Sequence, residues 1–182
     1  TLLIANNGNP FSLGGVESLM YSDLSPKVME ENKVGQKGLG FRSVLNWSKE
    51  IYIASYDLHI KFSKEHANNF LEEILQEKPQ IRDIIKRKTK KAFPVSILRC
   101  PYIEEDKSLK KEVDYDTVIE LTLKDNVEKF IKNQINADII PEILVFLNKL
   151  EEIEVKTDEH HFVINKTLQD NTIIITKTDY LN

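Results

Sequence analysis

Apolar and polar residues alternate in several short segments, and these segments predict β-strands. Residues 2–5 form a short apolar run that ends in the turn-forming cluster Asn6-Asn7-Gly8-Asn9-Pro10, as expected of a buried strand. The segments 51–55 and 58–62 alternate on either side of Tyr56-Asp57, which predicts a β-hairpin. Further extended segments are expected at 94–98, 116–123, 152–157, 161–165 and 172–176.

Other segments place apolar residues at helical spacing. Ser63 is a candidate N-cap for a long helical stretch, and Pro79 marks a break within that stretch. Pro141 suits the first turn of a later helix. Helices are expected at 15–20, from residue 39 through about Trp47, and at 63–91, 124–136 and 139–149, with polar loops at 22–36 and 103–114.

Antiparallel strands with helices segregated from them indicate an α+β fold. We expect a two-layer α/β sandwich, in which a mixed, mostly antiparallel sheet carries helices on one face. The chain has 182 residues, which is long enough for one domain with a real core. We expect that domain to comprise a segment at 1–62 with half of a binding site, a helical insertion at 63–112, and the remaining sheet and helices at 113–182.

Composition and charge exclude several classes of protein. The single cysteine, Cys100, excludes an internal disulfide framework and fits a reducing, cytoplasmic setting. No apolar run approaches the roughly 20 residues of a membrane span, so no membrane partner is expected. The net charge of -4 gives no general reason to expect nucleic-acid binding.

A glycine-rich loop is the first candidate for chemistry. Gly35, Gly38 and Gly40 stand at i, i+3 and i+5, and an apolar run at helical spacing follows at once. Glycine lets a ligand approach main-chain N–H groups, and a helix that opens behind such a loop favours an anion, usually phosphate. Many tight turns before helices look similar, so a plain glycine-rich connection is the alternative.

These residues, taken with their surroundings, resemble a known superfamily. Asn6-Asn7-Gly8 resembles the D-x-G box of the GHKL (Bergerat-fold) ATPases, which include gyrase, heat-shock chaperones, histidine kinases and MutL. The segment from Gly35 to Phe41 looks like the second glycine box of that superfamily. The likeness is closest to the ATPase modules of sacsin and of plant NO VEIN-type proteins with their bacterial relatives, on the residues Ser25-Pro26-Lys27, 116–121 and 141–150.

The resemblance implies an ATP site with Mg²⁺ in which Asn6 replaces the usual aspartate. Its amide oxygen still accepts a hydrogen bond from the adenine amine, but without a charge, which costs about 1 kcal/mol. Lys37 would contact the terminal phosphate or remain solvated, and Thr117 would lie near the adenine or serve only as a β-former. The implied nucleotide-binding residues are Asn6, Gly8, Ser25, Lys27, Gly35, Gln36, Lys37, Gly38, Leu39, Gly40, Phe41 and Thr117.

The resemblance also implies what else belongs to the site. In the superfamily, a helix before the D-x-G strand carries the acidic base and the asparagine that holds Mg²⁺. The chain starts at Thr1 without an initiator Met, so we expect it to be truncated at its N-terminus, and we assign no catalytic or metal-binding residue. ATP would order a lid at 20–36 and couple to other domains of a larger parent protein.

Two other functions compete with ATP binding. The first is a degenerate interaction domain that keeps the fold but not the nucleotide, which Asn6 and Asn9-Pro10 favour. The second is nucleic-acid binding through the basic run at 82–91. We expect that run instead to be a solvated helix face with Ile84 and Ile85 turned inward. The sequence leaves the oligomeric state open, and His160-His161 lacks the spacing of a metal site.

Overall fold

The computed structural model describes residues 1–21, 39–88, 95–105 and 114–180. It confirms an α+β fold of helices and antiparallel sheets. The chain divides into two compact units, Thr1–Asp125 and Asn126–Asn182. Each unit has its own sheet, so the last three strands do not join the sheet of the first unit.

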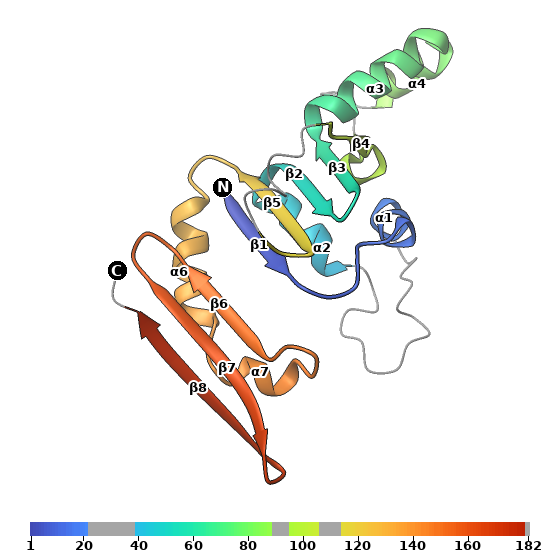
Figure 1. Ribbon diagram of the computed structural model, residues 1–182. Coiled ribbons are helices and arrows are strands. Elements are labelled where there is room, and N and C mark those ends of the chain that lie inside the picture. The colour runs from blue at the N-terminus through green and yellow to red at the C-terminus, as the bar shows by residue number, and fades with distance from the viewer. Residues whose placement is uncertain (22–38, 89–94, 106–113, 181–182) are drawn as a thin grey trace. The chain divides into compact units, whose positions relative to one another are not determined.

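The first unit is built on a five-stranded antiparallel sheet (Figure 1). The strand order is β1-β5-β2-β3-β4, so β5, late in the sequence, lies between β1 and β2. Ile119 of β5 pairs with Ile4 on one side and with Ile53 on the other. The bounds are β1 Leu2–Asn6, β2 Ser48–Ser55, β3 Leu58–Ser63, β4 Tyr102–Ile103 and β5 Thr117–Leu123.

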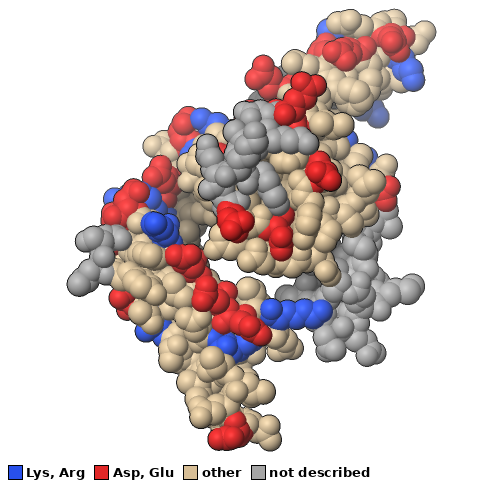
Figure 2. Space-filling view, in the orientation of Figure 1, with Lys and Arg blue, Asp and Glu red and all other residues tan. Residues whose placement is uncertain are grey.

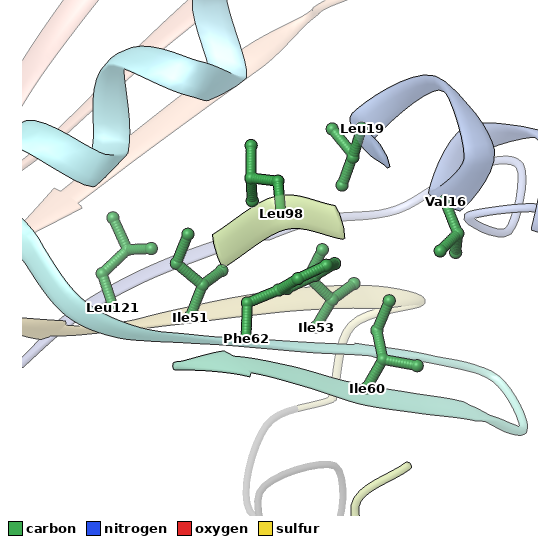
Figure 3. Close-up of a cluster of buried hydrophobic side chains, with 8 residues drawn as sticks. All are labelled: Val16, Leu19, Ile51, Ile53, Ile60, Phe62, Leu98 and Leu121. Atoms are coloured by element: carbon green, nitrogen blue, oxygen red, sulfur yellow. The ribbon is translucent and has the colours of Figure 1, made fainter. Parts of the chain in front are cut away.

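Helices cover one face of this sheet. Alternation along the strands places a row of apolar side chains on that face, and Val16, Leu19 and Leu98 pack onto them from the helical layer. Figure 3 shows this core, whose buried members are Val16, Leu19, Ile51, Ile53, Ile60, Phe62, Leu98 and Leu121. The layer comprises the helices α1 Leu13–Met20 and α2 Leu39–Ser43 and the 3₁₀ turns η1 Val44–Asn46 and η2 Ile97–Arg99.

The opposite face of the sheet carries a smaller and more polar set of side chains. Tyr52, Ala54 and Val118 form a second buried cluster there. The phenol of Tyr52 lies 2.7 Å from Nδ1 of the buried His59. Lys61, on the same face, pairs with Glu104, and its ammonium lies 5.3 Å from the centre of the Tyr52 ring.

Two helices follow β3 in the first unit, α3 Lys64–Glu77 and α4 Pro79–Lys88. The predicted cap is confirmed, because the Ser63 hydroxyl accepts a hydrogen bond from the His66 N–H at 3.1 Å. The predicted break at Pro79 is also confirmed, because Lys78 leaves the helical conformation (φ -132°, ψ 66°) and Pro79 begins the second helix.

The second unit packs helices against a three-stranded antiparallel sheet in the order β6-β7-β8. Leu144 from the helical part packs on Val155, Phe162 and Ile164 of the sheet. Asp170 and Asn171, with φ of 49° and 61°, form the tight turn between the last two strands. The bounds are α6 Glu128–Asp138, α7 Ile143–Phe146, β6 Glu152–Lys156, β7 His161–Gln169 and β8 Thr172–Tyr180.

Four predicted elements differ from the structure. The segment 94–98 was expected to be extended, but Ile97 and Leu98 lie in the 3₁₀ turn η2, which buries Leu98 in the core. The helix expected from residue 124 begins only at Glu128, because Asn126 adopts φ 66° in a turn. Ile103, expected to begin a loop, is instead the last residue of the short strand β4.

The helix expected at 139–149 is reduced to the single turn α7. At its end, the ammonium of Lys166 of β7 donates to the carbonyls of Leu144 and Leu147 at 3.1 and 2.7 Å. The same two carbonyls also accept the backbone N–H groups of Leu147 and Leu150, so Lys166 adds a charged donor at the C-terminal end of this turn. None of the helices among the described residues is long and apolar enough to cross a membrane.

The helix-covered core predicts a large difference between two leucines of the first unit. Leu98 is 1% exposed, whereas Leu13 is 74% exposed. We expect Leu98→Ala to lower the free energy of unfolding by about 2–5 kcal/mol, through lost burial and the cavity left behind. Leu13→Ala, the matched control, should change it by less than about 0.5 kcal/mol.

Urea unfolding measures this difference through the fluorescence of Trp47, the single tryptophan of the chain and a residue of the first unit. Equal losses for the two variants would contradict the placement of the core.

Candidate functional site

Three strands of the first sheet bring polar residues together at one end. Asn6, the last residue of β1, pairs with Thr117, the first residue of β5. Ser55, the last residue of β2, pairs with Thr117 from the other side. Alternation places all three on the helix-covered face of the sheet. The structure therefore brings together Asn6 and Thr117, two of the residues predicted to bind nucleotide.

A buried hydroxyl pair holds these strand ends together. Ser55 Oγ and Thr117 Oγ1 lie 2.7 Å apart, and both residues are buried. Ser55 Oγ also accepts a hydrogen bond from the Phe11 N–H at 2.8 Å, which fixes the chain just before α1. The Thr117 hydroxyl thus has a partner inside the protein, as a buried polar group requires.

Asp116 clamps the turn that follows β1. Its carboxylate accepts a hydrogen bond from the Gly8 N–H at 2.8 Å, and its own N–H donates to the side-chain oxygen of Asn7 at 3.2 Å. Gly8 adopts φ +132°, which strains any residue with a side chain, although the space beside its Cα is open. The glycine is therefore needed for the shape of this turn.

The carboxylate of Asp116 also affects the pKa of Tyr56. Tyr56 lies in the turn between β2 and β3, with φ 51°. The negative charge of Asp116 raises the pKa of the Tyr56 phenol, since it opposes formation of a second negative charge, and burial and a hydrogen bond to Asp116 act in the same direction.

Asn6 remains the exposed polar side chain at this end of the sheet. Its Nδ2 donates to the Asn7 carbonyl at 3.3 Å, a bond that turns the amide nitrogen toward the backbone. The side-chain oxygen can still accept a hydrogen bond from a donor such as an amine. The contact of that oxygen with an adenine amine remains a prediction.

The glycine loop lies mostly outside the described residues, as do Ser25, Lys27, Gly35, Gln36, Lys37 and Gly38. The helix expected behind the loop does begin at Leu39, and Gly40 lies within it. It is only five residues long before the η1 turn continues to Asn46. Phe41 packs half-buried against the main core, which is a structural role.

Sequence reasoning missed two residues that organise this end, Ser55 and Asp116. Their contacts join residues 62 and 108 positions apart, so no local pattern marks them. It also missed Arg42 and Arg99, which donate to the carbonyls of Leu19 and Met20 at the end of α1. In a sequence, such a contact can be recognised when a basic residue lies in or next to the last turn of the helix. Arg42 and Arg99 are far from α1 in the sequence, so this signal is missing.

Other polar features of the chain lie elsewhere. Shallow cavities of about 270 and 230 Å³ are lined by other residues than those predicted to bind nucleotide. His161 pairs with Glu154 at 2.8 Å and stacks on Tyr180. In the described part of the chain, no group of three or more His, Cys, Asp or Glu side chains is arranged to hold a metal ion.

Comparison with known proteins adds no family to this description. No family model, curated protein or solved structure matches the chain. The interpretation of the site consequently rests on the residue types, the strand register and the hydrogen bonds given above.

The contact between Asp116 and Tyr56 can be tested by titration. We expect Asp116→Asn to lower the pKa of Tyr56 toward the ordinary tyrosine value of about 10, because the amide removes the charge but keeps an acceptor for the Gly8 N–H. NMR of tyrosine labelled at Cζ would measure it. Asp57→Asn, in the same turn, is the control and should leave the pKa unchanged. An unchanged pKa in Asp116→Asn would contradict the electrostatic contact.

Proposed function

We propose that this chain is an ATP-binding module of the GHKL type, active in the cytoplasm and coupled to neighbouring domains. The observation that carries the proposal is the register of Asn6 with Thr117. These two positions, far apart in the sequence, were assigned to the adenine end of the site from separate motifs. Their adjacency on one face of the sheet supports that assignment.

The arrangement around the pair supports the same proposal. Gly8 turns the chain away after β1, and the glycine motif at 35–40 leads directly into α2. We propose that the amide oxygen of Asn6 accepts from the adenine amine, and that the N–H groups of the glycine motif receive the phosphates. ATP would carry Mg²⁺, and its binding would order the loop at 20–36.

A degenerate interaction domain is the second candidate, and specific contacts favour it. The Gly8 N–H is bonded to Asp116, the Thr117 hydroxyl to Ser55, and Phe41 packs into the core. Groups that a nucleotide would use thus have internal partners. The two candidates differ in one property, which is affinity for ATP.

Calorimetric titration with ATP, ADP and a non-hydrolysable analogue, each with Mg²⁺, separates these candidates. We expect binding heat and a raised melting temperature, and we expect Gly38→Val to abolish both because its side chain blocks approach to the loop. The control is Gly14→Val, since a Cβ at Gly14 meets only the Ser12 hydroxyl, at 3.8 Å. A chain that gives neither heat nor thermal shift would favour the interaction domain. Unchanged affinity in Gly38→Val would remove the loop from the site.

Asn6 offers a second test, in which affinity should increase. Asn6→Asp restores a charged acceptor and should tighten ATP binding about fivefold, or ~1 kcal/mol. Asn9→Asp, the control, adds the same charge to an exposed position of the same turn and should leave the affinity nearly unchanged. Equal effects of the two substitutions would show that general electrostatics, and not the base contact, is being measured.

A further inference from the structure

The helices α3 and α4 form an arm on the first unit, and this arm has little core of its own. α3 packs against β3 and η2, with Ala67 and Leu75 buried. α4 packs against α3 and has no buried residue (Figure 1). We call residues 64–88 the arm.

Large apolar side chains are exposed along the arm. Phe70, Ile74, Ile81 and Ile84 are 46%, 39%, 46% and 52% exposed. The sequence predicts that Ile84 and Ile85 turn inward; the structure corrects this for Ile84, which is exposed, whereas Ile85 is half-buried. The four residues lie nearly symmetrically about Glu77, with Phe70 and Ile84 each seven positions away. The spacing of four positions in α3 and of three in α4 places each exposed pair on one side of its own helix, and exposed apolar surface of this kind is typical of interaction sites.

The charges of the arm are divided between its two helices. α3 carries one lysine and four glutamates, a net charge of -3. α4 carries four basic residues and one aspartate, a net charge of +3. Charged side chains of both signs are visible over the arm in Figure 2. Glu72 and Arg82 attract each other within the chain at 2.8 Å.

We propose that the arm is a dimerisation surface whose occupant is the arm of a second copy, running antiparallel. In that arrangement Phe70 packs against Ile84 of the second copy, and Ile74 against its Ile81. In each copy, α3 then lies along the oppositely charged α4 of the other copy, so the dimer contains two such contacts. A two-fold axis can align the helices in this way whatever the angle between α3 and α4.

Individual charges agree with this register. With Ile74 opposite Ile81, Arg82 of the second copy falls opposite Glu73, and its residues 86–88 fall within one helical turn of Glu65 or Glu72. Basic side chains are long enough to span that distance. The pairing also buries the apolar residues between the charged ones, as in other helical interfaces.

The opposite net charges of α3 and α4 favour a second copy of the chain over anionic lipid or nucleic acid as the ligand of the arm. Anionic lipid and nucleic acid both attract α4 but repel the acidic α3 beside it. A second arm complements both halves at once. The opposite charges of the two helices therefore select a copy of the same chain.

Charge reversal in one helix at a time tests the proposal. The variant Lys86→Glu/Arg87→Glu/Lys88→Glu makes both helices acidic, and Glu65→Lys/Glu73→Lys/Glu77→Lys makes both basic. Sedimentation velocity of the full chain should show a dimer for the parent protein and a monomer for each variant alone. An equimolar mixture of the two variants should form a heterodimer, because each arm then complements the other.

The apolar contact is tested with a matched pair of substitutions. Ile81→Ser should weaken the dimer about tenfold or more. Ile103→Ser, at an 80% exposed position outside the arm, should leave it unchanged. Circular dichroism and Trp47 fluorescence establish that every variant is folded.

Several outcomes would overturn the proposal. These are a parent chain that stays monomeric at every soluble concentration, a mixture of the two reversal variants that stays monomeric, and a dimer that survives both reversals. Binding of the monomer to phosphatidylserine vesicles or to duplex DNA, with no dimer present, would assign the arm to those ligands instead.

Discussion

The insertion of β5 between β1 and β2 is the constraint on which the first unit depends. β5 is the only strand of that sheet, as described, that joins the first strand of the chain to the hairpin of β2 and β3. Val118 and Leu121 are fully buried on its two faces, one in each apolar cluster. Its first residue, Thr117, also bonds to Ser55. The same strand therefore completes the sheet, separates two cores and assembles the candidate site.

The parts of the fold that could be predicted are those encoded by neighbouring residues. Alternation on both sides of Tyr56-Asp57 was sufficient for the β2–β3 hairpin, and Ser63 with Pro79 fixed the start of α3 and the break before α4. The errors arose where distant contacts decide. Lys166, from β7, contacts the carbonyls at the end of the short α7, and Leu98 is buried in the core from a 3₁₀ turn.

In the candidate site, too, local motifs could be predicted and contacts between distant residues could not. Asn6 and Thr117 could be proposed from local motifs, but their pairing is a property of the sheet. Ser55 and Asp116 could not be found, because only the register of the strands brings them to this end. These two residues hold the strand ends in place. Asp116 accepts a hydrogen bond from the Gly8 N–H, and Ser55 pairs with the Thr117 hydroxyl beside Asn6. A site held in this way is preorganised, which favours a ligand that needs little rearrangement, but it also leaves fewer donors for that ligand.

The pairing of β1 with β5 has a consequence for how the protein is made. Residues 2–6 are synthesised more than a hundred residues before their partner strand, which begins at residue 117. Until β5 has been synthesised, this apolar segment lacks the strand that it pairs with in the structure, and contacts of such long range form slowly. Unpaired apolar strands promote aggregation in folding intermediates. Protection of this segment from aggregation therefore depends on how soon β5 follows it.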